Sequence, residues 1–395
     1  MERFGSYQLL EQIGVGGMAE VFLARHTGIE GFEKDIVIKR IRPHLSATPA
    51  FVDMFLAEAK LAAQLSHPNI VTIYDLGKIG DSFFIAMEYI AGKDLSSIIP
   101  RAKKLGIPFP IEYAVKIASH VCEALYWAHS KTDTRNNPLN IVHRDVSPEN
   151  IRVAWTGTVK ILDFGIAKAA TQFHETKAGE IKGKVVYMSP EQVLGHDLDH
   201  RSDIFSLSVV LYECITGLKL FNGTNDLVVM NTIVEGKIHP PSYFRDDVPP
   251  QIEAIVMKGL EKNRNRRYAS AFDMQFDIDQ FLAGHDFTPS NVHLSNFMKQ
   301  LFREDIENEQ VRRAKQQTSG APPPAARRPE ALSRDDEGPR PITLNVSDIS
   351  DGLVIGFTTE ELQTLRRLAD RSDQTIEQVV RDIVTHYLKY QRQHD

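Results

Sequence analysis

The sequence predicts an α+β fold in which a small, sheet-rich lobe precedes a larger helical lobe. Between residues 7 and 89 apolar and polar residues alternate as in strands, and one segment, 51–65, has the spacing of a helix. From residue 94 onward helical spacing prevails, interrupted by one short strand-rich stretch at 151–162. A change in composition near residue 316 separates these lobes from a small C-terminal module.

The elements of the two lobes follow from the same patterns. In the first lobe, runs of β-branched and aromatic residues predict strands at 20–24, 35–39, 70–74 and 83–87. In the second lobe, apolar residues three and four apart predict helices at 111–130, 202–217, 226–236, 251–260 and 270–283.

The rest of the chain divides into three parts. Residues 284–315 are expected to form a helical extension, with an amphipathic helix at 291–314. Residues 316–342 hold six prolines and few large apolar side chains, which predicts a disordered linker. Residues 343–395 are expected to form a small strand-helix-helix (β-α-α) module, with a strand near 353–357 and helices that begin at capping boxes at Thr358 and Thr375.

Composition narrows the class of protein. Apolar residues make up 42% and charged residues 25% of the chain, as in soluble globular proteins. The net charge of -6 argues against a nucleic-acid partner. No apolar run is long enough for a signal peptide or a membrane span, so we expect a cytoplasmic location and no membrane partner. Cys122 and Cys214 lie in apolar-periodic segments and are expected to be buried thiols.

A glycine-rich segment joins the first two predicted strands. It reads Ile13, Gly14, Val15, Gly16, Gly17, Met18, Ala19, Glu20, Val21. Glycines let the backbone approach a phosphate closely, because no Cβ intervenes, although a hairpin turn explains the segment equally well. Lys39 ends a later apolar strand, where its ammonium suits phosphates, and Glu58 on the following helix is a candidate partner for it. In isolation a surface lysine is as good an explanation of Lys39.

Polar residues of the second lobe form a second group. Asp145 and Asn150 lie five residues apart in the segment 141–150, and Asp163 follows a predicted buried strand 18 residues after Asp145. Carboxylate and amide oxygens suit Mg²⁺, whereas the end of a strand followed by a turn is the structural alternative for Asp163. Farther on lie Glu191, Asp203 and Arg267, each of which also fits a surface salt bridge.

Taken in order, these residues resemble the catalytic domain of eukaryotic-like, bacterial-type Ser/Thr protein kinases. The order is Gly14, Lys39, Glu58, Asp145, Asn150, Asp163, Glu191, Asp203, Arg267. The resemblance covers residues 7–283 and implies a bilobal kinase fold, ATP with Mg²⁺ (or Mn²⁺) as cofactors, and protein substrates.

The resemblance also implies a role for each residue. Asp145 accepts the proton of the substrate hydroxyl, Lys39 holds the phosphates, and Asn150 and Asp163 hold the metal ion. Met87 is a gatekeeper-like residue, and backbone groups of Glu88 and Ile90 meet adenine. Ile13 and Val21 cover the adenine, and Val37 narrows the slot that holds it. Asp203 supports the catalytic loop, and Arg267 pairs with Glu191. Arg144 receives a phosphate from the activation segment. Thr176 and Thr171 are the candidate phosphorylation sites in that segment.

The sequence departs from the family pattern at several positions. Ala19 stands at the third glycine position and Ser147 where a lysine is usual, while Lys184 stands where threonine is usual. We hypothesise that Lys184 supplies the charge missing at Ser147, the alternative being weak activity with Lys184 exposed. A weakly active kinase or pseudokinase scaffold therefore remains the second interpretation of the chain. Tyrosine specificity is disfavoured, because the arginine typical of that loop does not follow Asp145.

The C-terminal module is similar to ribbon-helix-helix proteins, which dimerise through a shared strand pair. Its apolar strand lacks side chains that read bases, and residues 351–395 carry 6 basic and 8 acidic residues. We therefore expect residues 343–395 to serve dimerisation or docking rather than DNA binding. A helical hairpin that folds back on the preceding domain remains the third alternative.

Overall fold

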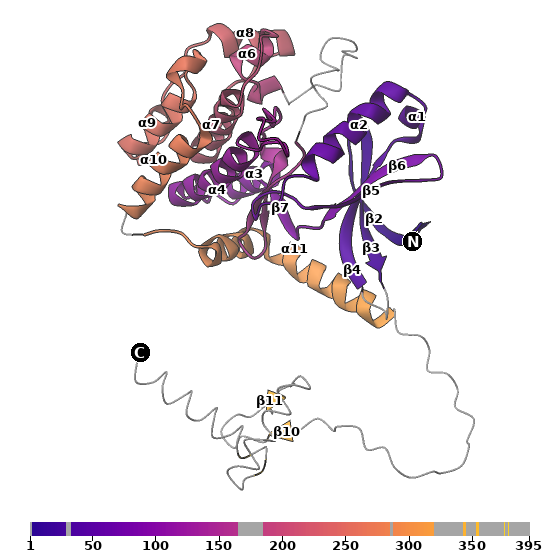
Figure 1. Cartoon of the computed structure of the whole chain (residues 1–395). Helices are drawn as coiled ribbons and strands as arrows, with labels where there is room; N and C mark the ends of the chain where they lie inside the picture. The colour runs from indigo at the N-terminus through magenta and orange to yellow at the C-terminus, as the bar shows by residue number, and fades with distance from the viewer. Residues whose placement is uncertain are drawn as a thin grey trace, which may run out of the picture. The chain divides into compact units, whose positions relative to one another are not determined.

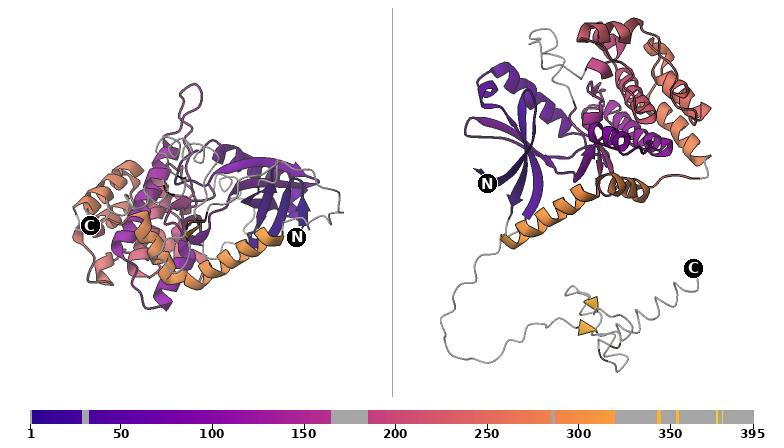
Figure 2. Two further views of the ribbon diagram at one scale, coloured as in Figure 1. Left: turned by 90° about the horizontal axis from the view of Figure 1, so that it is seen from below. Right: turned by 180° about the vertical axis from the view of Figure 1, so that it is seen from behind.

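The computed structural model describes residues 2–28, 33–164, 185–284 and 287–319, together with 343–344, 353–354, 375 and 378. The chain divides into two units, Met1–Gly320 and Ala321–Asp395. The first unit has the predicted α+β architecture, with a sheet lobe and a helical lobe (Figures 1 and 2). Cys122 and Cys214 are buried free thiols, as predicted.

The sheet of the first lobe has six antiparallel strands in the order β1-β2-β3-β4-β6-β5. Their bounds are β1 Glu2–Phe4, β2 Tyr7–Val15, β3 Ala19–Thr27, β4 Glu33–Ile41, β5 Ile73–Ile79 and β6 Ser82–Glu88. Two helices follow β4, α1 Pro43–Ser46 and α2 Pro49–Ala62. Successive side chains of a strand point to opposite faces. Accordingly Val37 packs in the cluster with Phe55 and Ala59 of α2, and Ile36 and Ile38 pack in the separate cluster of Phe4 and Phe84.

One predicted strand was misplaced. We expected a strand at 70–74, but β5 begins at Ile73 and continues to Ile79. Ile70 instead forms an isolated bridge to Ile161, and the Val71 N–H donates to the Ile161 carbonyl, so these apolar residues join the sheet lobe to the helical lobe. Their burial gave the strand-like signal, whereas β5 continues through polar residues and a glycine that do not alternate.

The helical lobe is built around α7 Arg201–Thr216, which is buried along almost all of its length. The other helices are α3 Leu95–Lys104, α4 Ile111–His129, α6 Pro190–Val193, α8 Asp226–Glu235, α9 Pro250–Gly259 and α10 Ala271–Ala283. Short 3-10 helices lie at Pro148–Asn150, Val185–Tyr187, Pro241–Tyr243 and Arg264–Arg266. A small sheet faces the first lobe, with strands β7 Gly92–Asp94, β8 Ile151–Ala154 and β9 Val159–Ile161. The strand-rich stretch predicted at 151–162 is thus confirmed.

The predicted helical extension is present as helix α11, Asn291–Ser319, but the helix continues through 316–319, where the linker was expected to begin. Its first half packs into the core of the helical lobe through Leu294, Phe297, Met298 and Leu301. Phe302 has non-helical backbone angles, φ -131° and ψ 34°, so the helix bends there. No helix among the described residues is long and apolar enough to cross a membrane.

Only a few residues of the second unit are described. Strand β10 Thr343–Leu344 pairs with β11 Leu353–Val354 of the same chain. A ribbon-helix-helix protein would pair this strand with a second copy, so that resemblance is not supported. The Thr375 N–H donates to Gln378 Oε1 (2.9 Å) and the Gln378 N–H to Thr375 Oγ1 (3.3 Å), which is the predicted capping box. The predicted helices themselves lie outside the described residues.

Candidate active site

An ion pair joins the two lobes at the candidate site. Lys39 Nζ lies 3.0 Å from Asp163 Oδ1, and the lysine side chain is the more buried of the two. Lys39 is placed by strand β4, in register with Val21 on one side and Ile85 on the other. Asp163 follows β9 with φ 41°, a left-handed conformation that costs energy for a residue other than glycine. The turn after β9 therefore directs this carboxylate toward the sheet lobe.

Asp145 and Asn150 are held together in the loop before β8. Asn150 Nδ2 donates to the Asp145 carbonyl (2.8 Å) and to its Oδ2 (3.0 Å). His143 links this loop to the segment of Asp163, because its Nε2 contacts the Leu162 carbonyl at 2.9 Å and its ring packs on Phe164. Burial lowers the pKa of His143, which favours the neutral ring. The two carboxylates thus sit on segments that are fixed to each other.

The buried Asp203 of α7 fixes the backbone of the loop that carries Asp145. Its carboxylate accepts hydrogen bonds from the backbone N–H groups of His143 and Arg144, both at 2.8 Å, and contacts His129 Nε2 at 2.8 Å. Burial alone would raise the pKa of Asp203, but the hydrogen bond and charge of His129 outweigh it and hold the pKa below its ordinary value. Arg144 itself has φ 66°, so the loop keeps a strained backbone that Asp203 helps to stabilise.

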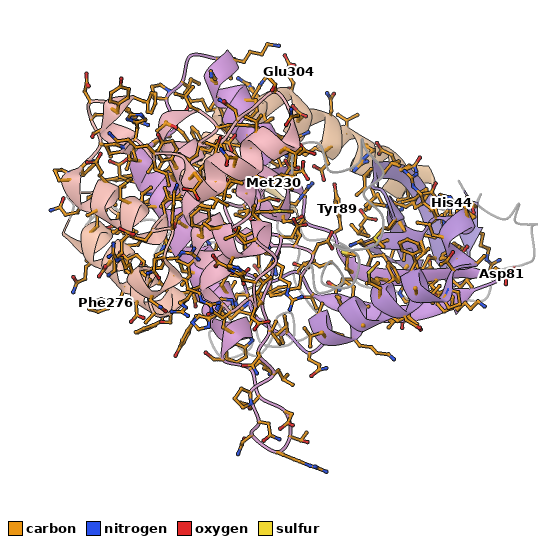
Figure 3. The ribbon with its side chains drawn as sticks, turned by 90° about the horizontal axis from the view of Figure 1, so that it is seen from above. His44, Asp81, Tyr89, Met230, Phe276 and Glu304 are labelled. Carbon is orange, nitrogen blue, oxygen red and sulfur yellow. The ribbon has the colours of Figure 1, made fainter. Side chains whose placement is uncertain are left out.

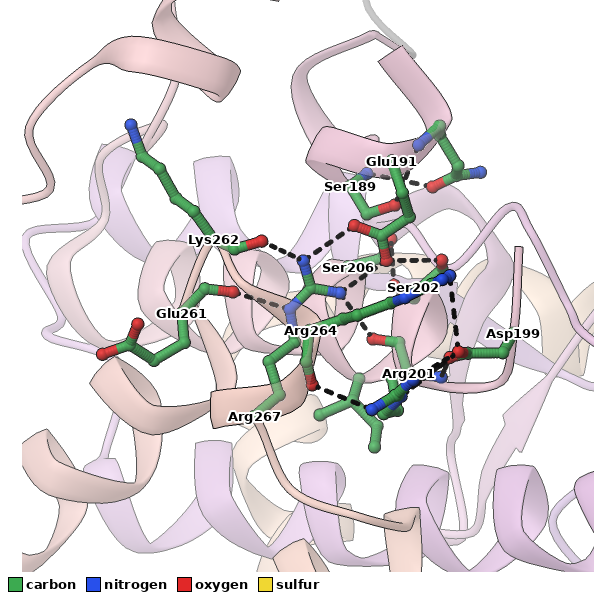
Figure 4. A network of polar contacts seen from close by, with 12 residues as sticks. Ser189, Glu191, Asp199, Arg201, Ser202, Ser206, Glu261, Lys262, Arg264 and Arg267 are labelled. Atoms are coloured by element: carbon green, nitrogen blue, oxygen red, sulfur yellow. Dashed lines mark hydrogen bonds and ion pairs between the residues drawn. The ribbon is translucent and has the colours of Figure 1, made fainter. Parts of the chain in front are cut away.

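A second buried network is centred on Glu191 and Arg267 (Figure 4). Arg267 makes a bidentate pair with Glu191, at 2.6 Å and 2.8 Å, and Ser202 Oγ donates to the same carboxylate at 2.7 Å. The next residue, Gln192, donates from Nε2 to the Arg144 carbonyl at 3.0 Å. The Glu191 network therefore reaches the segment that carries Asp145.

The comparisons with known proteins give this arrangement its family. The family model described as "Protein kinase domain" matches residues 7–278. The chain belongs to the protein kinase family. Membership implies the use of ATP with a divalent metal ion and proteins as substrates. Among the described residues no cluster of three or more His, Cys, Asp or Glu side chains could hold a metal. The oxygen donors of Asp163 and Asn150 nevertheless suit a metal ion that is also bound by phosphate oxygens.

Several relatives match the kinase domain. The chain is 41% identical over 312 residues to the tyrosine-protein kinase MasK of Myxococcus xanthus, which covers 79% of this chain and 48% of MasK. It is 36% identical over 283 residues to the serine/threonine-protein kinase PknB of Mycobacterium leprae, with 70% of this chain and 43% of PknB covered. The chain therefore spans less than half the length of these curated relatives. The crystal structure of the Mycobacterium tuberculosis PknI kinase domain shares the fold, with a TM-score of 0.52 and 24% identity over 71% of this chain and 97% of that one.

The glycine-rich segment of the kinase domain connects β2 with β3. The Gly16 N–H donates to the Ala19 carbonyl (2.8 Å), and Gly14 lies opposite Val21. Ile13 and Val15 are exposed. Val37 and Met87 are buried and lie opposite each other on β4 and β6. These residues line the sheet-lobe side of the candidate nucleotide site.

Met87 also borders a small cavity behind the ion pair. Its wall includes Ala59, Ile73, Ile85, Asp163 and Phe164. The cavity therefore lies between α2, the sheet and the segment that follows β9.

The hinge between the lobes follows Met87. Two contacts fix Glu88. Its N–H donates to the Thr72 carbonyl at 2.9 Å, and its carboxylate forms an ion pair with Lys160 at 2.9 Å. The Ile90 carbonyl accepts from Arg152 Nε at 2.8 Å. Figure 3 shows Tyr89 between the two lobes.

Four residues singled out in the sequence are not placed by the structure. Lys184, Thr171 and Thr176 lie outside the described residues, and Glu58 belongs to α2 but its side chain is not described. Sequence reasoning in turn missed His129, Gln192 and Arg152. These three side chains act through backbone groups or through partners distant in sequence, and no motif marks them.

Proposed function

We propose that this kinase domain transfers the γ-phosphate of ATP to serine and threonine hydroxyls of proteins, itself included, in cytoplasmic signalling. The observation that carries the proposal is the joint placement of Lys39–Asp163 and Asp145–Asn150 on two segments fixed by His143. Phosphoryl transfer asks a protein mainly to position the reactants and to neutralise charge. Oxygen ligands, a lysine and a carboxylate base in one place supply those functions.

Each residue has a definite task in this proposal. Asp145 accepts the proton of the hydroxyl nucleophile, and its orientation is fixed by Asn150. Lys39 holds the nucleotide phosphates, and Asp163 and Asn150 hold Mg²⁺. When bound, the ion supplies positive charge to the phosphate oxygens. The adenine rests against Val37 with backbone groups of Glu88 and Ile90, and Ile13 and Val21 cover it.

The accepting hydroxyl needs its own test, because the named relatives include both a tyrosine kinase and Ser/Thr kinases. We favour serine and threonine, since no arginine follows Asp145 in the loop. One basic peptide synthesised with Ser, Thr or Tyr at a single position separates the two, with Asp145→Asn as the inactive control. Faster labelling of the Tyr peptide would replace the Ser/Thr proposal by a tyrosine kinase, and no labelling of any peptide would favour the scaffold interpretation.

The environment of Ser147 supports the hypothesis that lysine and the hydroxyl residue have exchanged positions, with Lys184 supplying the charge missing at Ser147. Ser147 is 2% exposed, and its Oγ is buried with no hydrogen-bond partner in the described part of the chain. A buried hydroxyl is expected to have a partner, so we propose that Lys184 approaches it and neutralises the transferring phosphate. Lys184→Ala should then lose most activity, and Ser147→Lys/Lys184→Thr should recover it. Full activity of Lys184→Ala contradicts the exchange.

Activation by phosphorylation is a separate proposal. Arg144 Nε is buried without a described hydrogen-bond partner, which suits an arginine that receives a phosphate. We propose Thr176, with Thr171 as the second candidate, as the autophosphorylation site. Phosphopeptide mapping of active protein tests this, and phosphate found only on other residues rejects it.

The C-terminal residues 343–395 are proposed to support self-association, which would raise the local concentration for phosphorylation in trans. Light scattering on the chain with and without 343–395 should give a larger mass for the full chain. Equal monomer masses contradict a dimer.

A further inference from the structure

Helix α11 reaches both lobes of the kinase. In Figures 1 and 2 it runs from the helical lobe toward the sheet strands. Its start is fixed in the helical lobe, where Ser295 Oγ donates to the Trp155 carbonyl at 2.6 Å and Arg101 Nε donates to the Leu301 carbonyl at 3.0 Å. Beyond the bend at Phe302 the helix continues past the hinge. It therefore connects parts of the fold that move separately when a kinase cleft opens or closes.

One carboxylate in the second half of α11 holds the hinge. Tyr89 OH donates to Glu309 Oε1 at 2.9 Å, and Trp155 Nε1 donates to Glu309 Oε2 at 2.6 Å. Tyr89 belongs to the hinge, and Trp155 to the turn between β8 and β9 of the helical lobe. Burial and the charge of Glu309 raise the pKa of Tyr89, so the hydroxyl stays protonated and remains a donor. Hydrogen bonds to an ionised acceptor are stronger than neutral ones.

A neighbouring arginine extends the chain of contacts to the sheet lobe. The Arg312 guanidinium pairs with the Glu11 carboxylate and lies 3.5 Å from Tyr89 OH. Glu11 is on β2, the strand that leads into the glycine-rich segment. A further ion pair, Lys93 Nζ to Asp305 at 2.8 Å, holds the helix to β7. Because the Glu11 side chain is 55% exposed, its pair contributes less than the two hydrogen bonds of Glu309.

We propose that α11 is a brace for the nucleotide site, in which Glu309 is a positioning residue that fixes the hinge for adenine and Arg312 restrains the strand before the glycine-rich segment. This inference rests on the proposed function, because it assigns the hinge to ATP. The alternative is that α11 only covers apolar surface of the helical lobe. That role would depend on the first half of the helix and not on Glu309.

The test uses the full chain and a matched control on the same helix. Glu309→Ala removes both hydrogen bonds, and Glu309→Gln keeps one acceptor oxygen. The control is Glu307→Ala, since Glu307 makes only an exposed i,i+4 pair with Arg303 among the described contacts. We expect Glu309→Ala to raise the KM for ATP about three- to tenfold with kcat changed less than about twofold. Glu309→Gln should be intermediate and Glu307→Ala unchanged.

Two further measurements decide how the effect arises. Tyr89→Phe combined with Glu309→Ala should be less than additive in KM, because both changes remove the same hydrogen bond. Amide hydrogen exchange without nucleotide should become faster at 88–92 and 7–15 in Glu309→Ala but not in Glu307→Ala. An unchanged KM and unchanged exchange in Glu309→Ala overturn the brace. If the wild-type chain binds no Mg-ATP, the proposed function and the role in ATP binding fail together. The exchange data then still decide whether α11 braces the hinge.

Discussion

The buried pair of Glu191 and Arg267 gives the sharpest prediction about stability. Arg267 is 5% exposed and Glu191 6%. Besides the bidentate pair, the guanidinium donates to the carbonyls of Glu261 (2.6 Å), Lys262 (3.0 Å) and Arg201 (3.1 Å). Arg267→Ala would leave a buried carboxylate without its cation and would remove the guanidinium donor from three carbonyls. Breaking a buried ion pair from one side costs about 3–5 kcal/mol, so we expect unfolding free energy to fall by about 4 kcal/mol.

Urea unfolding monitored by tryptophan fluorescence and circular dichroism measures this change. The control Arg303→Ala removes an arginine from a pair whose side chains are 83% and 60% exposed and should cost less than about 0.5 kcal/mol. Glu191→Leu/Arg267→Met replaces both charges by apolar groups and should recover most of the loss. A loss below about 1 kcal/mol in Arg267→Ala would refute the view that this pair is desolvated and structurally required.

Three further predictions concern other buried groups. Burial, with the charge of Lys116, lowers the pKa of His120 to about 4. The unfolding free energy should therefore fall as pH drops below about 6.5, by about 2 kcal/mol between pH 7 and 5, and this dependence on pH should be weaker in His120→Gln. Equal pH dependence of the two proteins in denaturant titrations would contradict this. Gly157→Ala should lower the melting temperature measurably, because Gly157 has φ +82° and the new Cβ would lie 1.8 Å from the Asn291 carbonyl oxygen. An unchanged melting temperature would show that the start of α11 does not pack against Gly157 in this way. Asp203→Asn places an amide NH2 against one of the two backbone donors, His143 N–H or Arg144 N–H, and should cost about 2–4 kcal/mol in urea unfolding. A wild-type midpoint would reject this expectation.

The sequence predicts the lobes well because long apolar periods dominate them. The helices α4, α7, α9 and α10 lie where helical spacing predicted them. The misplaced strand β5 shows the limit: burial of Ile70 and Val71 comes from contact with β9, which local alternation cannot distinguish from strand pairing.

The sequence likewise predicts some residues of the candidate site and not others. Motif order brought Lys39, Asp145 and Asp163 to attention, and the structure places Lys39 against Asp163 and Asn150 against Asp145. The contacts of Glu309 could not be predicted, since its partners are 154 and 220 residues away in sequence. Its own neighbours in α11 are mostly polar or charged, so no periodicity marks it as a contact residue.

Mg-ATP binding and self-labelling by the purified chain, compared with Asp163→Ala, test directly whether this site transfers phosphate. We expect the wild-type chain to bind Mg-ATP and to label itself. We expect Asp163→Ala to remain folded but to label itself at least about 100-fold more slowly, because the carboxylate proposed to hold the metal ion is gone. Equal labelling by the two proteins would contradict the assignment of phosphoryl transfer to this site.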